Sequence, residues 1–462
     1  MSGRQAHVLL NGLRGGQGLM TKRHLGLLLC TVPGLYLLLS PIYALLNYQL
    51  FAAETPHFVR YVLIPGLLGA AVIATGLLAK PRFSALVGVC ASSVLLGLFL
   101  FEAMHTVSVV SVRLEMLGQL SKAQADTLMR NKNMVPGFTL RSLNRLSGTD
   151  ELPEALLSGF PSTQVVLCTS KGGVVSYRAD RYGFNNPDDV YNRRLDLMLL
   201  GDSFVEGFCL PPGEDLASSV RAGGATTASI GIRGNGPLVE LAMLGRFGKV
   251  LRPRHVMIVF VEGNDWENLE RELAVPWLRE ALSPDANYGL QSTAQETMRE
   301  ARSIVAERKN TPVTSIDLLT RTSLLRNFVA LQQTLARLGL VYPKIAGNKP
   351  EFRKILHRAK ELANSWGGTF TLVYVPRMDR FIGPLASDQP FDPLRRRVLD
   401  AAAAEAIPVI DLHEVMRAQA DPILLYAPDA HFSRAGAKFA ANEILRSIAA
   451  KGTGLPITAQ KK

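Results

Sequence analysis

Residues Leu197 to Cys209 read LMLLGDSFVEGFC, a run in which apolar residues stop abruptly at Gly-Asp-Ser. A short unbroken apolar run that ends at a turn signal is typical of a strand buried on both faces. A serine that directly follows such a strand lies at its carboxyl end, where parallel sheets bind their ligands. Ser203 can therefore be a nucleophile or the N-cap residue of a short helix, and the tripeptide alone fits both interpretations.

Further apolar runs follow along the chain, and helical patterns separate them. Continuous apolar strands that alternate with helices predict a mainly parallel sheet covered on both faces. We therefore expect an α/β fold, a three-layer sandwich around a mainly parallel five-stranded sheet. The expected strands are Leu195–Leu200, Ala225–Ile230, His255–Val261, Thr369–Val375 and Pro408–Leu412.

Three long apolar stretches precede this pattern, and each approaches the roughly 20 residues needed to cross a bilayer. The second stretch needs Phe58 to Tyr61 to complete it. A cleaved signal peptide is the alternative for the first stretch, but the apolar part is too long for one. We therefore expect three transmembrane helices, at Leu25–Leu46, Val62–Leu78 and Phe83–Ala103.

The net charge of +12 and the hydrophobic fraction of 47% bear on the class of partner. The basic residues form no recognisable nucleic-acid motif, so we expect no nucleic-acid partner. Lys and Arg residues precede the first apolar stretch, and Lys80 and Arg82 lie between the second and the third. By the positive-inside rule these segments lie in the cytoplasm, which places everything after about His105 on the other side of the membrane.

The hydropathy and charge patterns divide the chain into three parts. Residues 1–105 are expected to form a membrane domain, residues 106–164 a juxtamembrane helix (Val107–Lys132) followed by a linker or small subdomain, and residues 165–455 the α/β domain. A charged segment with a helical pattern interrupts the strands at about 266–342. This segment is either an insertion near the site, as a lid or polymer-binding face, or a solvated helical pair without a direct role.

The four cysteines divide between the first and the last of these parts. In an oxidising compartment Cys168 and Cys209 can pair, which would stabilise the α/β domain by roughly 4 kcal/mol. Two reduced, buried cysteines are the alternative. Cys30 and Cys90 lie in the expected membrane helices, where we expect plain apolar packing. Because CxxC and zinc-type spacings are absent from the sequence, we expect no metal and no cofactor.

Polar turns follow the next two expected strands. SIGIRGNGP, residues 229–237, contains Gly234, and backbone there can approach a ligand closely enough to donate an N–H to an oxyanion, although an ordinary glycine turn fits as well. VFVEGNDWEN, residues 259–268, contains Asn264, whose carboxamide suits a second oxyanion donor or an Asx turn. Glu262 and Asp265 do not define a glycosidase pair, and we expect both to be solvated or to support the site from behind.

Two histidines are candidates for the base that a serine nucleophile needs. His431 lies in YAPDAHFSRAG, residues 426–436, two residues after Asp429 and just before a helix that Ser433 would cap. His413 follows Asp411 at the same spacing, but it comes directly after the last strand. We therefore expect His431 to enter the crevice with Asp429 as its acidic partner, and His413 to begin the next connection.

The GDS, the glycine turn, the GND and the DAH resemble, in this order, the four blocks of the SGNH (GDSL-type) hydrolase superfamily over about Tyr177 to Ala450. The resemblance implies the flavodoxin-like SGNH fold, with Ser203 as nucleophile, His431 as base and Asp429 as the residue that orients it. It also implies an oxyanion hole made of the backbone N–H groups of Ser203 and Gly234 and the side chain of Asn264. The family more often has two residues between Asp and His. Here only Ala430 intervenes, a spacing similar to that of the alginate-acetylation members, which are envelope proteins.

A further stretch, YRADRYGFNNPDD at residues 177–189, is similar to membrane-attached bacterial members found with surface polysaccharides. Contact with the substrate and structural capping are both open for this stretch. The resemblance implies a bacterial inner-membrane, multi-pass serine esterase whose catalytic domain is periplasmic and acts on O-acyl, specifically O-acetyl, esters of envelope glycans.

Three alternatives stay open at this point. The same residues would serve an O-acetyltransferase for an exported polysaccharide, with a separate multi-span membrane protein as acyl donor. A lipid-directed esterase is the second, and a non-catalytic glycan-binding or assembly protein is the third.

Overall fold

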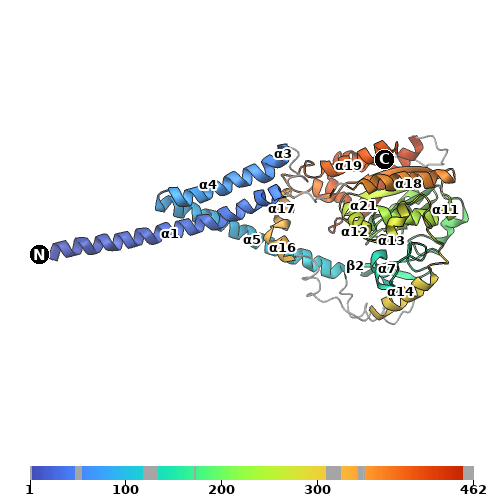
Figure 1. The fold of residues 1–462 in the computed structure, drawn as a ribbon, viewed down its shortest axis with the longest axis horizontal. Coiled ribbons are helices and arrows are strands. Elements are labelled where there is room, and N and C mark those ends of the chain that lie inside the picture. The colour runs from blue at the N-terminus through green and yellow to red at the C-terminus, as the bar shows by residue number, and fades with distance from the viewer. Residues whose placement is uncertain are drawn as a thin grey trace. The chain divides into compact units, whose positions relative to one another are not determined.

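A computed structural model describes residues 3–46, 55–117, 134–170, 173–308, 324–341, 347 and 349–450 of the chain. The chain forms two compact units, and Figure 1 labels many of their elements. The first unit comprises Met1–Val109, Ser323–Gly347 and Gly383–Pro393. The second comprises Val110–Thr322, Asn348–Ile382 and Leu394–Lys462.

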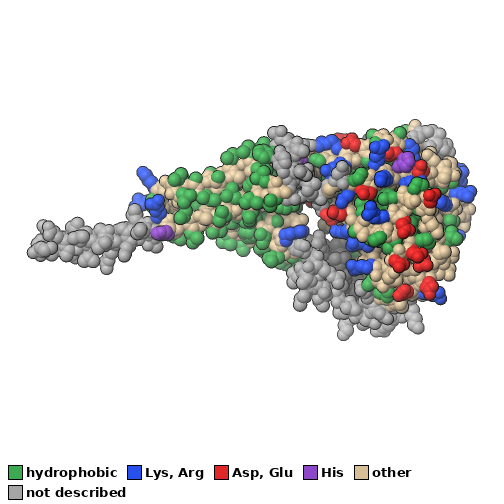
Figure 2. All heavy atoms as spheres, in the orientation of Figure 1, with side chains coloured by type: hydrophobic (Ala, Val, Ile, Leu, Met, Phe, Trp, Pro, Cys, Tyr) green, Lys and Arg blue, Asp and Glu red, His purple; other side chains and the backbone are tan. Residues whose placement is uncertain are grey.

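The first unit is built on three helices that are long and apolar enough to cross a membrane, as expected. Figure 2 shows apolar side chains over much of their described surface. The expected juxtamembrane helix is the continuation of the third, as far as Leu117, and its remainder lies outside the described residues. The elements are α1 (Gly3–Leu46), α3 (Thr55–Phe58), η1 (Val59–Leu63), α4 (Ile64–Leu78) and α5 (Pro81–Leu117), and the candidate spans are Arg23–Leu46, Val59–Leu78 and Pro81–Ser108.

Small residues bring the helices of this unit close together. A Cβ on Gly69 of α4 would lie 2.8 Å from the carbonyl oxygen of Gly34 of α1, a close approach typical of helix pairs in membranes. Cys30 is buried in this packing, as expected, but Cys90 is exposed. The expected packing of Cys90 is wrong because Gly88, two residues earlier, faces α1, so Cys90 points away from it.

The second unit contains the five-stranded sheet that the sequence predicts. Its strands are all parallel, in the order β5-β4-β6-β7-β8. Every residue of β4 and β5 is buried, which explains why both read as unbroken apolar or small-residue runs. The strands are β4 (Leu197–Gly201), β5 (Thr227–Gly231), β6 (His255–Val261), β7 (Thr369–Val375) and β8 (Val409–Asp411).

Helices cover both faces of this sheet, so the expected three-layer sandwich is confirmed. On one face, the apolar residues of β4, β6 and β7 pack against α9 (Leu216–Ala222), α20 (Leu412–Arg417) and α21 (Arg434–Ala450). On the other face lie α10 (Pro237–Met243) and α18 (Pro350–Ser365). Shorter connecting elements are η2 (Asp188–Asn192), α8 (Ser203–Glu206), η3 (Leu244–Gly248), α11 (Lys249–Leu251), η5 (Met378–Arg380), α19 (Asp392–Ala404) and η6 (Pro422–Leu425).

A small second sheet precedes the main one in the chain. Its order is β1-β2-β3, with β1 parallel and β3 antiparallel to β2. The segment expected to be a linker or small subdomain contains regular structure, namely β1 and α7. The elements of this part are β1 (Met134–Pro136), α7 (Leu140–Leu146), β2 (Gln164–Ser170) and β3 (Gly173–Arg178).

Within the charged segment at about 266–342, the structure describes helices, as the pattern predicts, and turns or irregular stretches such as residues 283–294 between them. Its last two helices belong to the first unit, whereas the others belong to the second. The helices are α12 (Asp265–Leu273), α13 (Pro276–Arg279), η4 (Glu280–Leu282), α14 (Gln295–Arg308), α16 (Leu324–Val329) and α17 (Gln332–Leu338).

Candidate active site

Ser203 is the first residue of α8, directly after the carboxyl end of β4. The interpretation of Ser203 as an N-cap is wrong, because the preceding residue, Asp202, is the N-cap of α8. Asp202 Oδ1 accepts the backbone N–H of Phe204 at 2.9 Å. The hydroxyl of Ser203 is therefore not needed to cap the helix and is available for another partner.

That partner is His431. The distance between His431 Nε2 and Ser203 Oγ is 2.9 Å, and the distance between His431 Nδ1 and Asp429 Oδ2 is 2.8 Å. Burial raises the pKa of the Asp429 carboxyl, but its hydrogen bond with His431 and the charge of that ring outweigh burial and hold the pKa below its usual range. The ionised carboxylate can therefore hold the Nδ1 proton and direct Nε2 toward the serine.

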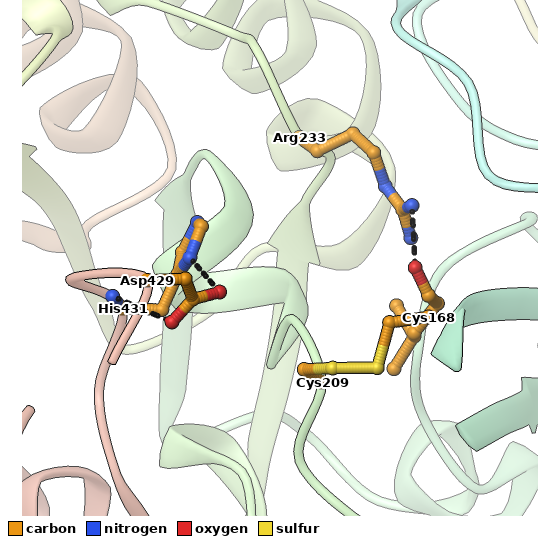
Figure 3. Close-up of a disulfide and its surroundings, with 6 residues drawn as sticks. Cys168, Cys209, Arg233, Asp429 and His431 are labelled. Carbon is orange, nitrogen blue, oxygen red and sulfur yellow. Dashed lines mark hydrogen bonds and ion pairs between the residues drawn. A yellow bond between two sulfur atoms is a disulfide. The ribbon is translucent and has the colours of Figure 1, made fainter. Parts of the chain in front are cut away.

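A tight turn makes the one-residue spacing between Asp429 and His431 workable. Ala430 adopts the left-handed conformation, with φ of +71°, and its N–H donates to the carbonyl of Ala427. The N–H of Ala427 in turn donates to the carbonyl of His431 at 2.8 Å. The turn thereby brings both side chains to the same side, as Figure 3 shows for Asp429 and His431.

Aromatic rings flank the His431 side chain. The ring centroid of Phe208 lies 4.5 Å from that of His431, and that of Phe204 lies 5.2 Å away. His413, the competing histidine, is buried on α20, where it pairs with Glu414 and stacks on Phe381. The structure thus brings His431 to Ser203 and places His413 in the connection after β8.

The side chain of Asn264 lies beside Ser203. Its Nδ2 donates to Asp202 Oδ2 at 2.7 Å, and Ser203 Oγ lies 3.4 Å from the same oxygen. Burial raises the pKa of Asp202, and hydrogen bonds from Asn264 and Phe204 partly offset this rise. Among the described residues, the backbone N–H groups of Ser203 and Gly234 have no hydrogen-bond partner, so both can donate to a ligand.

One face of α12 holds the glycine turn next to Asn264. Asn268 Nδ2 donates to the carbonyl of Asn235 at 2.8 Å, and Glu272 Oε1 accepts the N–H of Gly236 at 2.6 Å. Residues 264, 268 and 272 follow one another at four-residue intervals, which places them on the same side of a helix. Sequence reasoning missed Asn268 and Glu272, although this spacing was a signal that could have found them.

An ion pair connects the far end of α8 with the glycine turn. Glu206, the last residue of α8, accepts both the backbone N–H of Arg233 at 2.9 Å and its guanidinium at 3.0 Å. Arg233 Nη1 also donates to the carbonyl of Leu167 at 3.1 Å, beside the disulfide between Cys168 and Cys209 (Figure 3). The structure therefore contains the disulfide that the sequence allowed and joins it to the turn that carries Gly234.

The stretch at residues 177–189 has a structural role. The carboxylate of Asp180 accepts the backbone N–H groups of three following residues and the hydroxyl of Tyr191. Asn186 pairs with both the N–H and the carbonyl of Ser229 on β5. The Nδ2 of Asn185 donates to the carbonyl of Glu206 at 2.8 Å, which fixes the end of α8.

Glu262 and Asp265 are buried, so the expectation that they are solvated is wrong. The other expectation, that they support the site from behind, agrees with their contacts. Glu262 forms a fully buried ion pair with Arg380, 2.7 Å between Oε1 and Nη2. Asp265 Oδ2 accepts the N–H of Val261 at 2.6 Å. Both carboxylates therefore hold the segment around Asn264 rather than face a substrate.

Comparison with known proteins adds a family match. The model of the GDSL-like Lipase/Acylhydrolase family matches residues 199–439. The search of curated proteins found no significant match. Among solved structures, the lipase/acylhydrolase from Enterococcus faecalis is 16% identical, with a TM-score of 0.31, and the alignment covers 58% of this chain and 100% of that chain. A member of the lipolytic protein G-D-S-L family from Veillonella parvula DSM 2008 is 14% identical, with a TM-score of 0.29, and the alignment covers 55% of this chain and 97% of that chain.

Proposed function

Because this chain belongs to the GDSL-like lipase/acylhydrolase family and is an ester-hydrolysing enzyme, we propose that it is a membrane-anchored serine esterase for O-acetyl groups on envelope glycans. One observation carries the serine chemistry. A continuous chain of hydrogen bonds runs from Asp429 through His431 to Ser203, with distances of 2.8 and 2.9 Å. Both distances are those of hydrogen bonds along which a proton can be transferred.

In this proposal, Ser203 Oγ forms a bond to the acyl carbon while its proton passes to His431 Nε2. The tetrahedral intermediate collapses, the ester C–O bond breaks, and the proton on His431 passes to the leaving alkoxide. Water then attacks the acyl-serine in the same manner, and the acid and free Ser203 are released. Asp429 stays ionised throughout and stabilises the imidazolium that forms in each half-reaction.

The negative charge that develops on the acyl oxygen needs donors that are already in place. The backbone N–H groups of Ser203 and Gly234 are available for this task. A carboxamide carries two N–H bonds. One N–H of Asn264 donates to Asp202, and the other would donate to the same oxyanion.

The membrane side of the proposal rests on the charge pattern and the disulfide. Lys and Arg residues flank the ends of the spans that we assign to the cytoplasm, and by the positive-inside rule this charge pattern supports a periplasmic catalytic unit. The disulfide between Cys168 and Cys209 suits that oxidising compartment. An enzyme held at this place meets exported glycans, whose O-acetyl esters fit a serine esterase.

The proposed chemistry is tested with the full-length protein in detergent micelles and p-nitrophenyl acetate as substrate. We expect p-nitrophenol release by the wild type and by Ser303→Ala, an exposed serine of α14, and loss of at least 10³-fold in Ser203→Ala. Equal rates for the wild type and Ser203→Ala would overturn the assignment of the nucleophile.

The substrate is tested in cells that carry either the wild-type chain or Ser203→Ala. We expect mass analysis of the surface glycans to show more O-acetyl in the variant, because the esterase no longer removes it. Less O-acetyl in the variant would show transfer to the glycan instead. An unchanged O-acetyl content would overturn the glycan as substrate. The assignment of Ser203 as nucleophile would then still be decided by the p-nitrophenyl acetate test.

A further inference from the structure

Residues 324–341, which we call the hairpin, pack on the apolar helices of the first unit. They comprise α16, α17 and the residues that follow. The hydroxyl of Tyr36 on α1 donates to the carbonyl of Val329 at 2.7 Å. The ring of Phe328 lies 5.5 Å from that of Phe99 on α5. The hairpin therefore touches two of the three candidate membrane spans.

A buried carboxylate fixes the hairpin to α5. Glu102 lies within the span Pro81–Ser108 and is fully buried. It accepts the backbone N–H of Gln333 at 3.0 Å, and from Thr334 it accepts the N–H at 2.7 Å and the hydroxyl at 2.9 Å. A carboxylate in an apolar helix is costly unless it has such partners. Glu102 therefore stabilises the packing of the hairpin on α5.

A second segment of the unit, residues 383–393, contacts both the hairpin and the second span. The N–H of Leu385 donates to the carbonyl of Leu338 at 3.0 Å. Arg60, at the start of the second span, donates to the carbonyls of Gly339 and Leu385. The hydroxyl of Tyr61 donates to the carbonyl of Val341 at 2.7 Å. All three candidate spans thus contact these two segments.

The heights of these contacts along the helices agree with one another. At 1.5 Å per residue, Tyr36 lies about 20 Å along α1 from Arg23, and Phe99 lies about 27 Å along α5 from Pro81. Ser40 Oγ donates to the carbonyl of Tyr61, which places Tyr61 one helical turn beyond Tyr36. Measured from Arg23 and Pro81 across a hydrocarbon core of about 30 Å, these contacts lie in its outer third, toward the boundary with the headgroups.

The outward surface of the two segments suits that depth. Leu325 is 77% exposed, Leu385 is 53% exposed and Val329 is 47% exposed, although each lies in a segment packed on membrane helices. Arg326 and Arg337 lie on the same hairpin. Exposed leucines beside arginines are typical of helices that lie in the interface of a bilayer, with apolar side chains in lipid and cations at the headgroups.

We propose that the hairpin and residues 383–393 form a collar embedded in the lipid bilayer, at the boundary between acyl chains and headgroups on the periplasmic side. The partner of this surface is phospholipid. The inference rests on the proposed membrane anchoring. It assigns the end of the helical segment at 266–342 to the membrane rather than to a lid or a polymer-binding face.

The collar is tested by spin labels on the full-length protein in phospholipid vesicles. Cys30 and Cys90 are first replaced by alanine, the disulfide is kept, and one cysteine is introduced at position 325, 67 or 290. Leu67 is 62% exposed on the second proposed span, and Leu290 is 59% exposed in the second unit, so they serve as the lipid and water references. The relaxation of each label by oxygen and by a water-soluble nickel chelate is measured.

We expect the label at position 325 to match the label at position 67, with strong relaxation by oxygen and at least fivefold weaker relaxation by nickel than at position 290. A label at 325 that matches 290, while 67 reports lipid, would overturn the collar and leave the anchoring intact. A label at 67 that reports water would overturn the anchoring itself. A label at position 385 repeats the test on the second segment.

Discussion

Glu206 and Arg233 form a buried ion pair, with 3.0 Å between Oε2 and Nε. Glu206 ends the short helix that Ser203 begins, and Arg233 directly precedes Gly234. The pair therefore fixes the distance between the proposed nucleophile and a proposed oxyanion donor. A further hydrogen bond, from Arg233 to the carbonyl of Leu167, extends this arrangement to the disulfide.

We expect Glu206→Gln to lower kcat about 10-fold or more while KM changes little. The uncharged amide cannot replace the paired carboxylate, so Arg233 is left as a buried unpaired charge and the glycine turn shifts. Steady-state kinetics with p-nitrophenyl acetate measure the effect. Glu214→Gln is the control, because Glu214 pairs with the exposed Arg434. Equal kcat in both variants would show that the pair does not position the site.

We expect Asp429→Asn to lower kcat by about 10³- to 10⁴-fold, since an amide holds the wrong tautomer of His431 and does not stabilise the imidazolium. KM and the melting temperature should change far less than kcat, because the side chain keeps its size. Asp285→Asn, on the exposed surface, is the matched control. A variant with kcat within threefold of the wild type would exclude Asp429 as the partner of His431.

Glu272 should make stability depend on pH. Burial raises its pKa from 4.5 to about 8, against the opposing hydrogen bonds from Leu238, Gly236 and Val239. The folded state therefore binds a proton that the unfolded state releases between these values, so stability falls as pH rises from about 4.5 to about 8. The slope from one such group is at most about 1.4 kcal/mol per pH unit.

Glu272→Gln removes this titration while it keeps an acceptor for the N–H groups of the glycine turn. We expect the free energy of unfolding of the variant to fall less steeply over that pH range than that of the wild type. Chemical denaturation at several pH values measures both slopes. Glu267→Gln, five residues earlier on the outer side of α12, should keep the wild-type slope. A wild-type slope in Glu272→Gln would show that this carboxyl does not titrate there.

Replacing both Cys168 and Cys209 by serine should lower the free energy of unfolding by about 4 kcal/mol, since the disulfide closes a loop with a sequence separation of 41. The loss of this link next to Phe208 and Arg233 should also lower kcat. Unfolding and kinetics are compared with Cys30→Ala/Cys90→Ala, which lacks both free thiols but keeps the disulfide. Identical unfolding curves would argue against a stabilising bond.

The sequence predicted those features whose signal is local. Unbroken apolar runs located the five strands, and the polar or glycine-rich turns that follow three of them contain Ser203, Gly234 and Asn264. The residues that hold this site were missed because their partners lie far away in sequence. Glu206 and Arg233 are 27 residues apart, and Glu272 reaches back to Gly236 across 36 residues. The packing of the hairpin at 324–341 on the apolar helices was also missed, because its mixed charge and short helices resemble a solvated surface.

Glu102→Ala should loosen the hairpin without disturbing the proposed chemistry. The change removes three hydrogen bonds and leaves the N–H groups of Gln333 and Thr334 without the acceptor that holds them. In vesicles we expect trypsin to cleave after Arg326 or Arg337 at least tenfold faster than in the wild type, while p-nitrophenyl acetate hydrolysis stays within twofold. Thr106→Val is the control, since the hydroxyl of Thr106 lies 3.5 Å from Glu102 and, among the described residues, donates no hydrogen bond to the hairpin. Equal cleavage in wild type and Glu102→Ala would show that other contacts, such as those of Tyr36 and Arg60, suffice to hold the hairpin.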